Sequence, residues 1–116
     1  MVNINDIMVS NRLETSNGLI YRVSFYDNIT VDDFVERKLV LEAVVCENSD
    51  GGFIIVDDNG YDETEIYESI CEANKTEYTV HYYDLQNKDL NKKDVVGLKS
   101  VLKLNDCNNI IDVIKK

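Results

Sequence analysis

The sequence has no run of eighteen apolar residues, no proline, no tryptophan and a single histidine, His81. Without such a run, no transmembrane helix is predicted. The first residues, Met1–Asp6, lack the basic start and the apolar block of a secretory signal, so we predict a cytoplasmic protein. Cys46, Cys71 and Cys107 make an odd count without paired spacing, which is typical of reduced thiols rather than of a disulfide framework.

Basic residues are nearly absent from the middle of the chain. Between Glu42 and Asp84 there are twelve acidic residues and one base, Lys75, whereas the last residues contain more lysines than acids. An apolar content of 44% argues against a disordered acidic tail. A folded surface with so strong a negative field repels nucleic acid and attracts basic protein surfaces.

Alternating apolar residues predict four strands, which cover residues 19–26, 39–46, 53–56 and 77–83. The glycines after Asn48 predict a hairpin loop between the second and third strands. The segment from Asp27 to Arg37 is read as a polar connection with room for one helical turn around Asp32 and Asp33.

Helical patterns are expected between and beyond these strands. Asp62 and Glu65 form a capping box that should begin a helix ending near Asn74, with Ile66, Tyr67, Ile70 and Cys71 on its buried face. Weaker patterns predict helices over residues 3–14, over residues 91–104, where a strand is the alternative, and over residues 106–116. The sequence therefore predicts a single α+β domain over residues 1–116. Its antiparallel sheet has about four strands, with a capped helix after the third strand and a C-terminal helix.

Motifs for catalysis or metal binding do not fit. Placing Gly60 at position six of a calcium-binding loop puts Ile55 and Ile66 at the first and twelfth positions, where acids are required. Cys71 lies among acids that oppose thiolate formation, and no phosphate loop, G-x-S-x-G elbow or H-E-x-x-H sequence occurs. We therefore expect neither enzymatic activity nor a cofactor, and no metal site.

The acidic stretch is the candidate partner-binding site. Glu65, Glu68 and Glu72 follow the i, i+3, i+7 spacing of one helix face, and a tyrosine beside carboxylates suits an arginine-rich partner. The predicted site residues are Asp57, Asp58, Tyr61, Asp62, Glu63, Glu65, Glu68 and Glu72. A solvated acidic face that only keeps the protein soluble is the competing interpretation.

The layout also resembles the small acidic phage proteins of the anti-CRISPR type, which inhibit host defence nucleases. The similar stretch comprises the strands at 38–46 and 53–56, the turn from Asn48 to Gly51, and the acidic helix opened by Asp62 and Glu65. The resemblance implies an inhibitor in the host cytoplasm whose carboxylates take the places of phosphates in a basic groove. The working residues would then be the acids at 57–72, aided by Tyr61. A nuclease or another basic effector would be the partner, with no nucleic acid or membrane bound directly.

Two other functions stay open at this point. An immunity protein that neutralises a basic toxin would use the same electrostatics. A small-ligand-binding protein would instead use aromatic strand faces to line a pocket, with Tyr21, Phe25, Tyr78 and Tyr82 as the candidate residues.

Overall fold

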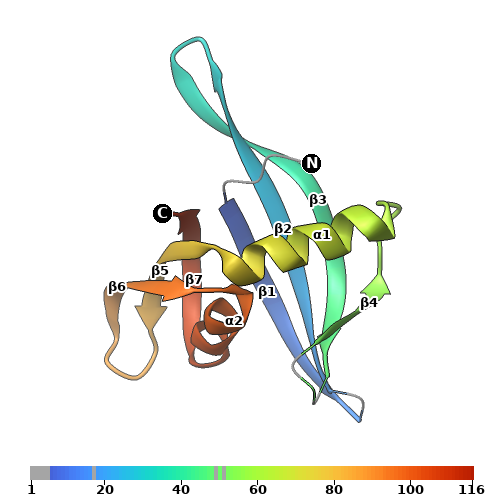
Figure 1. The fold of residues 1–116 in the computed structure, drawn as a ribbon. Helices are drawn as coiled ribbons and strands as arrows, with labels where there is room; N and C mark the ends of the chain where they lie inside the picture. Colours follow the sequence, from blue (N-terminus) through green and yellow to red (C-terminus); the bar gives the residue numbers. More distant parts are fainter. Residues whose placement is uncertain (1–5, 17, 49, 51) are drawn as a thin grey trace.

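The computed structural model describes residues 6–16, 18–48, 50 and 52–116. These residues form one seven-stranded antiparallel sheet and two helices (Figure 1). The elements are β1 (Asp6–Thr15), β2 (Gly18–Val31), β3 (Phe34–Glu47), β4 (Phe53–Asp57), α1 (Glu63–Lys75), β5 (Glu77–Asp84), β6 (Asp89–Val96), α2 (Leu98–Cys107) and β7 (Asn108–Lys115). The strand order is β4-β3-β2-β1-β7-β5-β6, which leaves β4 and β6 at the two edges of the sheet.

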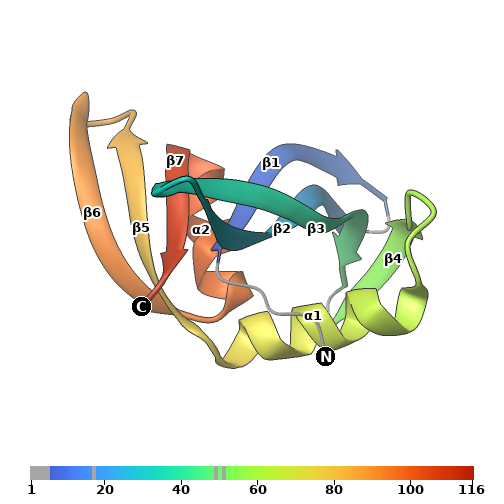
Figure 2. The same ribbon diagram turned by 90° about the horizontal axis from the view of Figure 1, so that it is seen from above.

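The core lies between one face of the curved sheet and the two helices, as Figure 2 shows. Val9, Val23 and Ala43 stand side by side on β1, β2 and β3, and all three are buried. The helices contribute apolar residues at helical spacing, Ile66, Ile70 and Ala73 from α1 and Leu98, Val101 and Leu102 from α2. Burial of these side chains fixes which side of α1 faces solvent.

The prediction of a four-stranded sheet is wrong, because three further strands stand where helices were expected. Four predicted strands are present as β2 to β5, and β1, β6 and β7 are added to them. The expected N-terminal helix is β1 over its described part, residues 3–5 lying outside the described residues. Ile7 and Val9 point inward and pair with Phe25 and Val23 of β2, so strand pairing prevails over a weak helical pattern.

The expected C-terminal helix is also a strand. Ile110, Val113 and Ile114 are spaced as on one face of a helix. In β7 the register against β5 shifts between the pairs Tyr82–Ile110 and His81–Asp112, so β7 carries an extra residue there. A bulge of this kind breaks the alternation of a strand and imitates the helical period.

The helix expected over residues 91–104 is half strand and half helix. Asn91 and Asp94 lie in β6, which is held to β5 by its backbone ladder although its side chains are nearly all exposed. Helix α2 begins only after Gly97, which has a φ of 91°. A Cβ at Gly97 would lie 3.0 Å from the carbonyl oxygen of Asn74, so only glycine fits this turn easily.

The expected polar connection after residue 26 is likewise part of the sheet. Strands β2 and β3 continue as a long hairpin up to the pair Val31–Phe34. At its tip, Asp32 and Asp33 take positive φ values of 50° and 67°, as in the tight turns that match the twist of paired strands. No helical turn forms there.

Candidate protein-binding site

The start of α1 is held by one of the predicted site residues. The Oδ1 atom of Asp62 accepts hydrogen bonds from the backbone N–H groups of Thr64, at 2.8 Å, and Glu65, at 3.3 Å. The predicted cap is therefore confirmed. The predicted end near Asn74 is one residue short, since α1 continues to Lys75 and Thr76 follows in an extended conformation.

Replacing Asp62 by alanine should lower the free energy of unfolding by about 1 kcal/mol, because two N–H groups lose their acceptor. Asp62→Asn keeps the acceptor oxygen and should cost much less. Urea unfolding of the two variants and the wild type measures the difference. Equal losses in both variants would show that charge, and not capping, is what Asp62 contributes.

The acids before the helix also accept hydrogen bonds from nearby backbone N–H groups. The Oδ1 atom of Asp57 accepts the N–H of Asn59, and that of Asp58 accepts the N–H of Gly60, both at 2.9 Å. Tyr61 is half-buried and packs against the core. Asp57, Asp58 and Asp62 thus shape the turn that leads from β4 into α1, and Tyr61 anchors it.

The acids best placed to meet a partner are Glu65, Glu68 and Glu72, which we call the acidic ridge. All three are exposed, whereas Ile66 and Ile70 of the same helix are buried. At 3.6 residues per turn they lie within about 60° of one another around the helix and span about 10 Å along it. Glu63 is exposed as well, but it lies on the opposite side of the helix from the ridge.

None of the seven predicted site acids forms an ion pair within the described part of the chain. Carboxylates elsewhere do: Glu42 lies 3.3 Å from Arg22, and Asp94 lies 2.8 Å from Lys116. The nearest base along the helix is Lys75, in the last turn of α1. No ion pair within the described residues therefore neutralises the ridge carboxylates.

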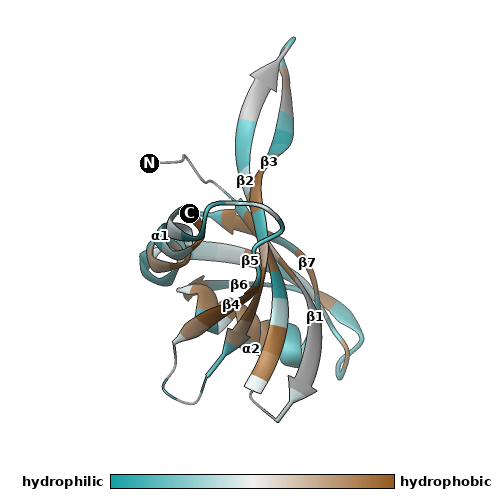
Figure 3. Cartoon of the chain, turned by 90° about the vertical axis from the view of Figure 1, so that its right-hand side faces the viewer, coloured by the Kyte–Doolittle hydropathy of each residue, from teal (hydrophilic) through white to brown (hydrophobic). Residues whose placement is uncertain are grey.

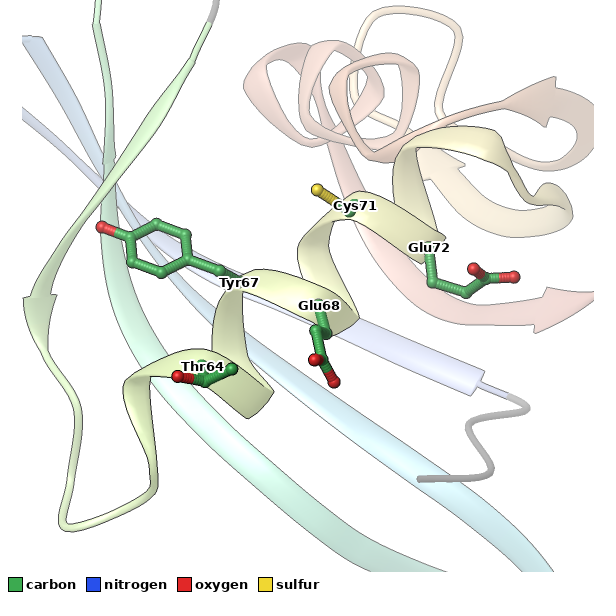
Figure 4. Close-up of a pocket in the computed structure, with 5 residues that line it drawn as sticks. All are labelled: Thr64, Tyr67, Glu68, Cys71 and Glu72. Atoms are coloured by element: carbon green, nitrogen blue, oxygen red, sulfur yellow. The ribbon is translucent and has the colours of Figure 1, made fainter. Parts of the chain in front are cut away.

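A shallow open depression of about 460 Å³ runs beside the ridge. It is lined by Thr64, Tyr67, Glu68, Cys71 and Glu72, and Figure 4 shows Tyr67 pointing towards β4 while Glu68 and Glu72 extend away from it. The Tyr67 oxygen accepts a hydrogen bond from the Ile55 N–H at 3.5 Å. An exposed aromatic ring thus lies next to unpaired carboxylates.

The sequence placed Tyr67 and Cys71 on the buried face, and this is wrong. Tyr67 is 42% exposed and Cys71 is exposed, while Ser69 and Ala73 are buried in their stead. The signal was present in the sequence: Ser69 and Ala73 follow Ile66 at i+3 and i+7, and small residues let a helix approach a sheet closely. The prediction assigned large side chains to the buried face and overlooked small ones at an equivalent helical spacing.

The aromatic residues expected to line a ligand pocket fill the core. Tyr21, Phe25 and Tyr78 are 1 to 2% exposed, and Tyr82 packs against them from a half-buried position. The Tyr21 hydroxyl donates to Asp106 of α2 at 3.1 Å, which ties that helix to the sheet. These rings therefore stabilise the fold.

Burial raises the pKa of Tyr78 to about 12 from its ordinary value of 10.0, and the negative charges of Glu72 and Asp6 add to the effect. Because the unfolded chain releases this proton first, the stabilising contribution is complete below pH 10.0 and is lost as the pH rises towards 12. The loss should reach roughly 3 kcal/mol. Urea unfolding at increasing pH should show this decline in the wild type and a weaker one in Tyr78→Phe; identical slopes would contradict the assignment.

The single histidine pairs with a carboxylate on the neighbouring strand. The Nδ1 atom of His81 lies 2.6 Å from Asp112, and this pair links β5 to β7. Cys46 is buried, whereas Cys71 and Cys107 are exposed. Across residues 6–16, 18–48, 50 and 52–116, no three His, Cys, Asp or Glu side chains converge as a metal ion would require.

Comparison with known proteins adds no assignment: the chain matches no family model, and neither a curated protein nor a solved structure shows significant similarity to it. In the described part of the chain, neither helix is long and apolar enough to cross a membrane. The arguments on function therefore start from the geometry and charge of α1.

Proposed function

We propose that the protein is an acidic inhibitor that binds a basic, nucleic-acid-binding protein through the outward face of α1. The observation that carries the proposal is the uncompensated ridge of Glu65, Glu68 and Glu72 on a helix anchored firmly to the core. Fixed charges of one sign steer an oppositely charged partner and set its orientation. The protein would act in the cytoplasm, without a cofactor and without a catalytic step.

The density of charge supports mimicry of a nucleic-acid strand. The three ridge carboxylates are spaced by about 5 Å of helix rise, against one phosphate per about 3.4 Å of axis along one DNA strand. A groove built to bind phosphates would therefore find a comparable row of negative charges on α1. Tyr67 adds a ring beside this row on which an arginine guanidinium can stack.

A plain solubilising surface explains the ridge less well. Such surfaces mix charges of both signs, yet Lys75 is the one base within α1, and Arg22 and Lys116 pair with acids outside this helix. Like charges at i+3 and i+4 also destabilise a helix by a few tenths of a kcal/mol per pair. The ridge thus carries a cost in stability that binding to a basic partner would offset.

Affinity capture at two salt concentrations tests the proposal. The tagged protein should retain a basic nuclease or another nucleic-acid-binding protein from host lysate at low salt and release it at high salt, because screening weakens interactions between exposed charges. Recovery of a basic toxin would instead assign the protein to the immunity proteins. If no basic protein is enriched over a tag-only control at low salt, the proposal is wrong.

A further inference from the structure

The hairpin of β2 and β3 projects from the body of the protein. Figures 1 and 3 show it from two sides, and it extends well past the other strands. In the described residues, β1 reaches only to the pair Asp6–Tyr26, so that residues 27–38 pair with each other alone. We call residues 27–39 the arm. Two strands without a third strand or a helix against them are only marginally stable in water.

One side of the arm is an open strand edge. Strand β4 pairs with β3 only from Val44 onward, and no other described strand lies along Phe34–Ala43 on that side. The Glu42 carbonyl accepts a hydrogen bond from the Asn59 side chain at 3.2 Å. Over residues 34–41, alternate backbone N–H and C=O groups are open for pairing with another strand. The edge also exposes apolar side chains, since Phe34 is 73% and Leu39 is 41% exposed.

We propose that two copies of this chain associate by antiparallel pairing of these β3 edges. The two-fold axis that relates two such antiparallel strands stands perpendicular to the sheet. Residues that face each other across this axis point to the same side of the sheet, so the sum of their two residue numbers is even. With Arg37 on the axis, Glu36 of each copy faces Lys38 of the other, which gives two ion pairs. With Glu36 or Lys38 on the axis, two like charges meet and neither ion pair forms.

The close approach of two Arg37 residues is the one unfavourable feature of this register, and the structure compensates it. The Nε atom of Arg37 lies 3.4 Å from the Oδ2 atom of Asp6, a residue only 4% exposed. The guanidinium also lies over the ring of Tyr26, 4.8 Å from its centroid. Each Arg37 is thus neutralised within its own chain and held away from the axis.

The same register covers apolar surface. It places Phe34, at the tip of one arm, opposite Val40 at the base of the other, twice over. Cross-strand apolar and charged pairs stabilise antiparallel strands, and the added backbone hydrogen bonds extend the two-stranded arm into a four-stranded one. The arm gains in the dimer the neighbours that it lacks in the monomer.

Charge exchange between Glu36 and Lys38 tests the register. Sedimentation of the wild type from about 1 µM to about 1 mM should show a reversible dimer, in the weak range expected of a small interface. Glu36→Lys places lysine opposite lysine, and Lys38→Glu places glutamate opposite glutamate. Each variant alone should raise the dissociation constant at least tenfold, whereas the double variant should restore it.

Mixing the two single variants gives the decisive result. A Glu36→Lys chain and a Lys38→Glu chain have complementary edges and should form a mixed dimer although each alone is monomeric. Because Lys38→Glu also places a carboxylate opposite Asp27 in its own hairpin, recovery in the mixture separates a lost contact from a disturbed arm. A wild type that is monomeric throughout, or single variants that dimerise as it does, would overturn the proposal. So would a mixture of the two that stays monomeric.

Discussion

Replacing Glu65, Glu68 and Glu72 together by glutamine should weaken binding of the basic partner about a hundredfold. Each lost ion pair costs about 1 kcal/mol at such an interface, and each 1.4 kcal/mol changes affinity about tenfold. The fall in affinity with rising salt should also become shallower, because fewer charges contribute. Isothermal titration with the captured partner at several salt concentrations measures both effects.

The matched control removes the same charge elsewhere. Asp32, Asp33 and Asp89 are exposed and lie outside α1, at the tip of the arm and at the start of β6. Their triple replacement by asparagine alters the net charge as much as the ridge variant does. It should change the affinity less than about threefold if the ridge is the contact surface. Equal losses in both variants would mean that only net charge matters.

Replacing the three ridge glutamates by glutamine should lower the affinity for the partner without lowering the stability of the fold. Removing like charges at i+3 and i+4 relieves repulsion of a few tenths of a kcal/mol per pair. Thermal unfolding of the ridge variant should therefore occur at the wild-type temperature or slightly above. A large drop would instead show that the glutamates support the fold.

Ile66→Ala should lower the free energy of unfolding by about 3 kcal/mol, because the Ile66 side chain is fully buried between α1 and the sheet. For a domain of this size the melting temperature should fall by roughly 15 °C. The removed methyl groups leave a cavity that the surrounding core fills only in part. Calorimetry or circular dichroism melts of the variant measure the effect.

Cys71→Ala on the same helix is the control. Cys71 is exposed, so its replacement should change the free energy of unfolding by less than about 0.5 kcal/mol. A small effect at Ile66 would show that α1 is not anchored through the face described here. The argument that the acidic ridge faces away from the core would then no longer hold.

The sequence predicts the elements in which one face is buried and the other is not. Helix α1 follows from Asp62 and from the spacing of Ile66 and Ile70, and β5 follows from the alternation of Tyr78 and Val80. In such segments the hydrophobic period alone distinguishes helix from strand. The existence of these elements, and the start of α1 at Asp62, could therefore be predicted from the sequence.

The remaining strands are set by pairing that the local sequence does not encode. Strand β6 is exposed along most of its length and is ordered by its backbone bonds to β5. In β7 an extra residue puts Ile110 and Val113 at a helical spacing. Strand order, bulges and edge positions depend on contacts between distant segments. Local sequence patterns therefore could not predict the seven-stranded sheet.

In the candidate site, too, some residue positions could be predicted from the sequence and others could not. The exposed glutamates of α1 follow from helical spacing, since the ridge lies on the side away from Ile66 and Ile70. The roles of Asp57 and Asp58 do not, because they depend on a turn whose backbone N–H groups these carboxylates accept. Charge alone cannot separate an acid that shapes a turn from one that is free to bind a partner.

Competition with DNA for the captured partner tests the central claim most directly. If the acidic ridge binds in the groove that takes phosphates, a labelled duplex bound to that partner should be displaced by the wild-type protein in proportion to its concentration. The variant lacking Glu65, Glu68 and Glu72 should fail to displace it. A stable complex of partner, duplex and wild-type protein together, or equal displacement by the ridge variant, would contradict this account.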